Sequence, residues 1–149
     1  FYLNNELTDF SFLPESAGHP VANRVEGGKR PRSSMAPTLV FAPDGSLRLV
    51  IGAAGGGTIP VQVAKALIGV IDWNLTAAEA IALPGLFAAG PALAVEPGSA
   101  LLAMRTPLEA LGHQFAERPL PFKANAVELR DGRWLGAADP RSEGVALGQ

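Results

Sequence analysis

The sequence predicts an α+β fold in which antiparallel sheets are covered by helices. Two pairs of β-rich runs are each joined by a strong turn signal, and the helical segments are grouped between these pairs. Strands and helices that are segregated along a chain favour antiparallel sheets, whereas strict alternation favours parallel ones. The chain has 149 residues, of which 48% are hydrophobic and 17% charged, so one folded domain over residues 1–149 is expected.

Residues 1–28 predict little regular structure. Residues 1–3 form an apolar run typical of the end of a strand, and because no polar segment leads into it we expect the native protein to extend before Phe1. Residues 4–9 are polar and turn-like. Residues 10–28 carry several glycines and prolines without a sustained period, which predicts a long surface loop.

The next segment predicts a hairpin followed by a helix. The β-rich runs Thr38–Phe41 and 47–51 flank Pro43-Asp44-Gly45, a strong turn signal. The glycine-rich residues 52–57 then lead into Ile59–Ile71, where Pro60 suits the first turn of a helix. The apolar positions at helical spacing are Ile59, Val63, Ala66, Leu67, Val70 and Ile71. Because Val61, Ala64 and Ile68 widen this face, we expect the helix to be largely buried.

Two capping-box patterns predict two further short helices. One begins at Thr76-Ala77-Ala78-Glu79 and ends near Pro84, and the other begins at Thr106-Pro107-Leu108-Glu109 and ends near Gly112. Short strands are predicted at Ala92–Val95 and Gln114–Glu117. A second hairpin is predicted where runs 126–129 and 134–137 flank Asp131-Gly132.

Composition excludes several classes of function. The formal net charge is −2 and there is no basic stripe, so we expect no nucleic-acid partner. No stretch reaches the roughly 18 to 20 apolar residues that a membrane span needs. The chain has no cysteine and its two histidines are isolated, so neither a disulfide nor a zinc site is expected, and no cofactor is predicted.

Three segments carry residues suited to binding charged groups. The glycine-rich turn before Thr58 suits an oxyanion or a phosphate at a helix N-terminus, although the Walker pattern fails because Gly57 stands where lysine is needed. Ser33-Ser34, held between prolines, suits a carboxylate. Glu6 and Asp9 suit an ammonium group. Each segment also has a plain alternative: a tight strand-to-helix turn, a polar loop and a solvated turn, respectively.

Taken together, these segments resemble the small subunit of γ-glutamyltranspeptidases, which are N-terminal-nucleophile hydrolases. The resemblance rests on residues 3–11, 29–38, 52–56 and 139–141, with the motifs Asn4-Asn5-Glu6, Arg30-Pro31-Arg32-Ser33-Ser34-Met35, Gly55-Gly56 and Asp139-Pro140-Arg141. They follow the family's order across nearly the whole chain. The resemblance implies part of an αββα sandwich, contributed by the C-terminal portion of the small subunit.

The resemblance also implies roles for six residues. Glu6 and Asp9 match positions that hold the α-amino group of a γ-glutamyl substrate. Ser33 and Ser34 match the pair that binds its α-carboxylate. Gly55 and Gly56 match the glycines whose N–H groups form the oxyanion hole.

The remaining implications concern the whole enzyme. It is expected to hydrolyse or transfer γ-glutamyl groups of small molecules such as glutathione. A threonine upstream of Phe1 is the expected nucleophile, exposed by self-cleavage of a precursor whose large subunit is the partner and supplies an arginine to the substrate carboxylate. A periplasmic or extracellular location is implied. Residues 10–28 look short beside members with a lid, which implies a more open site.

Two other functions stay open at this point. One is an acylase for glutaryl amides within the same superfamily, and the other is a non-catalytic homologue that acts as a binding module. In addition, the chain alone is expected to fold poorly, because its sheets would lose neighbouring strands and expose their edges.

Overall fold

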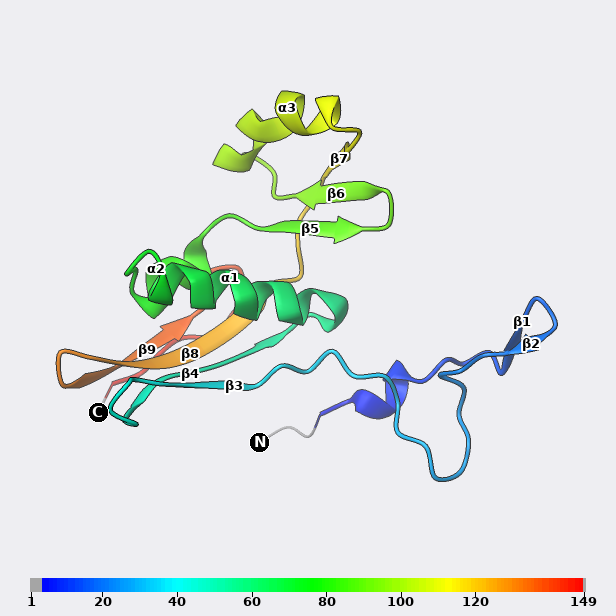
Figure 1. The fold of residues 1–149 in the computed structure, drawn as a ribbon, viewed down its shortest axis with the longest axis horizontal. Helices are drawn as coiled ribbons and strands as arrows, with labels where there is room; N and C mark the ends of the chain where they lie inside the picture. Colours follow the sequence, from blue (N-terminus) through cyan, green and yellow to red (C-terminus); the bar gives the residue numbers. More distant parts are fainter. Residues whose placement is uncertain (1–3, 149) are drawn as a thin grey trace. The chain divides into compact units, whose positions relative to one another are not determined.

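The computed structural model describes residues 4–148 and divides into two compact units, residues 1–34 and 35–149, which are described separately (Figure 1). The strand end predicted at residues 1–3 lies outside the described residues.

The first unit contains one short helix and one small hairpin. The 3-10 helix η1 covers Glu6–Asp9, and the two-residue strands β1 (Glu15–Ser16) and β2 (His19–Pro20) pair antiparallel. The prediction of an irregular loop over residues 10–28 is therefore wrong at this hairpin. Its turn, Ala17-Gly18, has φ angles of 49° and 76°, which suits a tight hairpin turn. Strands of two residues are too short to show a period in the sequence.

A four-stranded antiparallel sheet organises the second unit. Its order is β3-β4-β8-β9, and its strands cover Thr38–Phe41, Leu47–Ala54, Lys123–Arg130 and Arg133–Ala138. Both predicted hairpins are confirmed, and β4 and β8 join them at the centre of the sheet. β4 is longer than predicted, because Gly52, Ala53 and Ala54 pair with β8 as far as Lys123.

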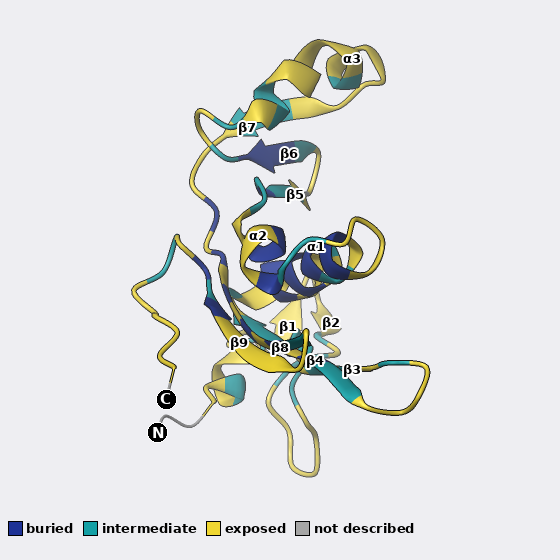
Figure 2. Cartoon of the chain, turned by 90° about the vertical axis from the view of Figure 1, so that its left-hand side faces the viewer, coloured by how far each residue is buried: buried dark blue, intermediate teal, exposed yellow. Residues whose placement is uncertain are grey.

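Helices α1 (Ile59–Ile71) and α2 (Ala77–Ala82) cover one face of this sheet (Figures 1 and 2). The predicted bounds of α1 are confirmed. Small side chains on the sheet, including Ala124, Ala126 and Ala137, let the helices approach closely. The core between the layers also contains Leu49, Ile51, Ile59, Val63, Ala66, Val70, Ala77, Ala80 and Ile81.

The prediction that α1 is largely buried is wrong for its outer side. Val61, Ile68 and Ile71 are 36%, 45% and 49% exposed. Only one side of a helix faces the sheet beneath it, so a helix that is apolar all round leaves a stripe uncovered in the described part of the chain. Gln62, which interrupts the apolar pattern, is buried instead.

The first predicted capping box is confirmed and the second is wrong. Thr76 and Glu79 make the reciprocal hydrogen bonds at the start of α2, and the buried Glu128 carboxylate accepts a further bond from the Ala77 N–H at 2.8 Å. Helix α3 covers Arg105–Ala110 and follows the 3-10 helix η3 (Ala100–Met104) without a break. Thr106 thus lies inside a helix, where it cannot take the extended backbone that an N-cap requires.

A three-stranded sheet completes the second unit. Its strands are β5 (Leu86–Ala89), β6 (Ala92–Val95) and β7 (Gln114–Glu117), in that order. The strands predicted at β6 and β7 are confirmed, whereas β5 was not predicted. β6 and β7 run parallel, which departs from the antiparallel expectation. The connection through η3 and α3 carries the chain back to the starting edge of β6 and makes this parallel return possible.

The face of the four-stranded sheet away from the helices is apolar and exposed. Leu39, Val50 and Val127 lie in one cross-strand row and are 58%, 36% and 44% exposed. Trp134 on β9 is 54% exposed. An exposed apolar sheet face favours association with another apolar surface, and the apolar edge strand β3 favours pairing with another strand.

We therefore expect the isolated chain to self-associate. Replacing Leu39 and Val127 by threonine keeps β-branched or strand-compatible side chains but removes apolar surface, so the double variant should be more monomeric in sedimentation velocity at the same concentration. Leu111→Thr, at a residue that is 77% exposed beyond α3, is the matched control and should change nothing. A wild-type chain that is monomeric and unfolds cooperatively would contradict the prediction.

Candidate functional site

The turn between β4 and α1 is built around two glycines with positive φ. Gly55 has φ 126° and Gly56 has φ 59°, and the 3-10 helix η2 (Gly56–Thr58) leads directly into α1. A Cβ atom on Gly55 would lie 2.3 Å from the Pro121 carbonyl oxygen and 2.6 Å from Thr58 Oγ1. A Cβ atom on Gly56 would meet nothing within 4 Å. Only Gly55 is therefore required by close packing as well as by its backbone angle.

The buried side chain of Gln62 fixes this turn. Its Nε2 donates to the Ala54 carbonyl oxygen and to Thr58 Oγ1, both at 2.9 Å, and its Oε1 accepts from the Lys123 N–H at 2.8 Å. Thr58 Oγ1 donates in turn to the Gly55 carbonyl oxygen at 3.0 Å. These bonds tie the turn to the end of β4, to the start of α1 and to β8, which makes it rigid.

The rigid turn leaves N–H groups available at the start of a helix. Among the described residues, the Thr58 N–H donates to the Gly55 carbonyl oxygen at 3.3 Å, whereas no acceptor is recorded for the N–H groups of Gly55 or Gly56. Unpaired N–H groups next to a helix N-terminus favour a negatively charged oxygen. The sequence indicated Gly55 and Gly56 but not Gln62, whose only signal was a polar residue one turn into an apolar helix.

The other four predicted site residues all lie in the first unit. Glu6 and Asp9 are three residues apart on η1, and because side chains at this spacing eclipse in a 3-10 helix they share one side of it. Asp9 and Ser33 are exposed, and Glu6 and Ser34 are half-buried. Two acidic side chains on one side of a helix suit an ammonium group, and adjacent hydroxyls suit a carboxylate.

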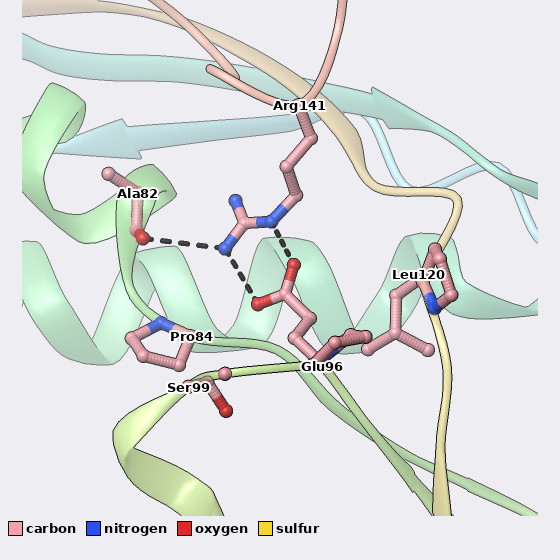
Figure 3. A pocket seen from close by; sticks show the side chains of 9 residues that line it. Ala82, Pro84, Glu96, Ser99, Leu120 and Arg141 are labelled. Atoms are coloured by element: carbon pink, nitrogen blue, oxygen red, sulfur yellow. Dashed lines mark hydrogen bonds and ion pairs between the residues drawn. The ribbon is translucent and has the colours of Figure 1, made fainter.

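Arg141 lines a cavity of about 410 Å³ but is fully engaged within the protein (Figure 3). Its guanidinium pairs with both carboxylate oxygens of Glu96 and with Asp139 Oδ1 at 3.0 Å. It also donates to the carbonyl oxygens of Ile81 and Leu83 at 3.2 and 2.8 Å. With every donor used, Arg141 serves as a structural clamp and has no N–H left for a ligand.

Burial and hydrogen bonding shift the pKa values around this clamp. Burial raises the pKa of Glu96, but hydrogen bonds from Arg141 and the Gly85 N–H outweigh it and leave that pKa below its usual value. The Glu96 carboxylate raises the pKa of Arg141. Lys65 donates to the carbonyl oxygens of Ile81 and Leu83, and burial, helped by the Arg141 charge, lowers its pKa from 10.5 to about 8.

Nothing in residues 4–148 points to a metal site or a membrane span. No cluster of three or more histidine or acidic side chains in this range is placed to hold a metal ion. No helix of this range is long and apolar enough to cross a bilayer.

Comparison with known proteins connects this geometry to one family. A sequence model of the γ-glutamyltranspeptidase family matches residues 1–149. A glutathione hydrolase proenzyme from Escherichia coli K12 is 36% identical over 94% of the chain, and one from Bacillus subtilis 168 is 30% identical over 98% of it. The chain spans only 25% and 24% of the lengths of these two relatives.

The structural comparison agrees with the sequence comparison. A mutant γ-glutamyltranspeptidase from Pseudomonas nitroreducens superposes with a TM-score of 0.81 at 28% identity, covering 100% of this chain and 81% of that one. This similarity confirms the predicted α+β fold class.

The two glycines of the turn should respond differently to substitution. Gly55→Ala places a methyl group against Pro121 and Thr58, so we expect it to lower the free energy of unfolding by about 3 kcal/mol or more. Gly56→Ala meets open space and should cost only the ~1–2 kcal/mol of a left-handed backbone. Equilibrium urea unfolding of the full-length protein measures both. Gly45→Ala, at φ 84° in the first hairpin turn and also in open space, is the control and should match Gly56→Ala; equal losses at all three positions would refute the steric argument.

The lowered pKa of Lys65 predicts a dependence of stability on pH. Between pH 8 and 10.5 the unfolded chain holds a proton on Lys65 that the folded chain has lost, so the free energy of unfolding should rise with pH across this window. Lys65→Met should remove this rise. The Ile81 and Leu83 carbonyl oxygens keep their bonds from Arg141 in that variant, so it should still fold. Urea unfolding at several pH values tests this, and identical pH slopes for both proteins would contradict it.

Proposed function

Because this chain belongs to the γ-glutamyltranspeptidase family, we propose that the protein from which it comes hydrolyses or transfers the γ-glutamyl group of glutathione and related γ-glutamyl amides. The observation that carries the proposal is the rigid turn at Gly55-Gly56, whose two N–H groups are free to bind an oxyanion at the start of α1. The acidic pair on η1 and the serine pair supply complementary charges for the two ends of an α-amino acid.

The chemistry proceeds through an acyl-enzyme. A threonine at the N-terminus of the mature small subunit, outside this chain, attacks the γ-carbonyl carbon, and its own α-amino group takes the hydroxyl proton. The carbonyl oxygen becomes an oxyanion, which accepts hydrogen bonds from the N–H groups of Gly55 and Gly56. The C–N bond then breaks, the amine leaves with a proton, and water or a second amine releases the γ-glutamyl group from the threonine.

Residues of the first unit recognise the substrate. The carboxylates of Glu6 and Asp9 bind the α-ammonium group, and the hydroxyls of Ser33 and Ser34 donate to the α-carboxylate. Neither of these residue pairs reacts, so they raise the rate only by holding the donor in a productive position.

The remainder of the active site comes from the same precursor. The large subunit produced by self-cleavage is the proposed partner, and its arginine completes the binding of the α-carboxylate. A complex of two subunits also accounts for the apolar face of the four-stranded sheet, which is exposed in this chain alone.

The acidic pair favours a γ-glutamyl donor over a glutaryl one. A glutaryl group has no α-amino group, and an acylase for it would have no use for two carboxylates on one side of η1. Retaining both would place uncompensated negative charge beside an apolar part of that substrate.

The complete precursor, once it has cleaved itself, should turn over γ-glutamyl-p-nitroanilide much faster than glutaryl-p-nitroanilide. Asp9→Asn removes the charge that faces the ammonium group and should raise KM for the γ-glutamyl donor about tenfold to hundredfold. It should not weaken the binding of the glutaryl donor, which has no ammonium group to lose a partner. Glu15→Gln, an exposed acid of the same unit, is the control. Absence of turnover after confirmed self-cleavage, or equal rates on both donors, would refute the proposal.

A further inference from the structure

The side chain of Asn23 joins the two halves of the proposed substrate-binding unit. Its Nδ2 donates to the Asp9 carbonyl oxygen at 2.7 Å, and its Oδ1 accepts from the Arg32 N–H at 2.8 Å. Asp9 is one member of the acidic pair, and Arg32 directly precedes Ser33-Ser34. A single amide therefore bridges the segment that binds the ammonium group and the segment that binds the carboxylate.

The backbone of Asn23 is held as well. Its carbonyl oxygen accepts from the Ser11 N–H at 2.8 Å, and Ser11 forms a single parallel β-bridge with Arg24. The side chain thus projects from a fixed point and does not simply follow a loop.

The chemistry of the two bonds requires an amide at this position. A carbonyl oxygen must receive a donor, and an N–H must reach an acceptor, so the side chain needs one of each on the same planar group. Aspartate has the same shape but would turn an acceptor toward the Asp9 carbonyl oxygen. Glutamine has the right groups on a side chain that is one methylene longer.

The distance between Asp9 and Ser33-Ser34, which Asn23 links, matters for binding the substrate. The ammonium and carboxylate groups of an α-amino acid are attached to one carbon atom, so their separation is fixed. Receptors for the two groups must keep a matching separation, and an error of about 1 Å is enough to lose most of the benefit of positioning.

We propose that Asn23 is a positioning residue, and that its side-chain amide sets the distance between Asp9 and the Ser33-Ser34 pair to match the α-amino acid end of the γ-glutamyl donor. This inference rests on the proposed function. Asn23 touches no substrate and acts through the backbone at Asp9 and Arg32.

A neighbouring ion-pair cluster provides the matched control. Glu26 pairs with Arg24 at 2.7 Å and with Lys29 at 2.9 Å, and these contacts brace the same loop without touching Asp9 or Arg32. Glu26→Gln weakens the loop in general, whereas Asn23→Asp breaks only the bond to Asp9 and keeps the bond from Arg32.

The test uses the full-length, self-cleaved enzyme with γ-glutamyl-p-nitroanilide as donor and free L-glutamate as inhibitor. Asn23→Asp should raise both KM for the donor and Ki for glutamate about tenfold or more, while kcat changes by less than about threefold. Glu26→Gln should change neither constant by more than about twofold. Asn23→Ser removes both bonds without adding charge, so it should raise KM and Ki at least as much as Asn23→Asp does. It provides the test if Asn23→Asp does not cleave itself.

The possible outcomes distinguish an error in the proposed function from an error in the role of Asn23. If the cleaved wild type turns over no γ-glutamyl donor, the proposed function is wrong. If the wild type is active but the Asn23 variants keep wild-type KM and Ki, or if Glu26→Gln weakens binding as much as they do, only the role of Asn23 is wrong. A fall in kcat alone, with KM and Ki unchanged, also refutes it.

Discussion

The guanidinium of Arg141 is the interaction on which the architecture of the second unit depends. It donates to the carbonyl oxygen of Ala82, the last residue of α2, and to the Glu96 carboxylate beyond β6 (Figure 3). It also donates to the Ile81 and Leu83 carbonyl oxygens, which a helix end leaves unpaired, and to Asp139 beyond β9. The small cluster of Ala94, Leu120 and Phe122 offers little apolar burial of its own. The bonds of Arg141 therefore hold the three-stranded sheet to helices α1 and α2 at a place where few apolar side chains are buried. Burying the Arg141 charge costs desolvation energy, but this cost is offset because each N–H donor of the guanidinium and each paired carboxylate has a partner. A lysine could not reproduce this planar arrangement of donors.

Hydrogen bonds to a buried polar side chain also hold the Gly55-Gly56 turn at the start of α1. Gln62 is buried in an apolar helix face, yet each polar atom of its side chain has a partner, on Ala54, Thr58 or Lys123. Apolar packing tolerates small sliding movements, whereas hydrogen bonds are directional and hold atoms to within a fraction of an ångström. The proposed binding of an oxyanion at the Gly55-Gly56 turn requires that precision. Bonds of the same kind link Asn23 to Asp9 and Arg32 in the first unit.

The differences between the expected and observed elements have separate physical reasons. The strands of the hairpin β1–β2 have two residues each, too few for a pattern to stand out from their surroundings. Helix α3 begins early because η3 precedes it, although the local pattern favoured a cap at Thr106. The outer side of α1 is exposed because only one side of a helix can face the sheet beneath it, whereas the sequence of α1 is apolar on both sides.

The sequence by itself determined both long hairpins, the bounds of α1, the capping box at Thr76 and the ordered motifs that mark the family. These features are local: a turn residue, a period or a short motif is complete within a few neighbouring positions. Only the tertiary structure showed that Gln62 fixes the Gly55-Gly56 turn, that Asn23 links Asp9 to Arg32, and that Arg141 links α2 to Glu96 and Asp139. Each of them bonds to residues far away in the chain, from nine positions for Asn23 and Arg32 to 61 for Gln62 and Lys123. Such bonds depend on where folding brings the backbone, and no local pattern records them.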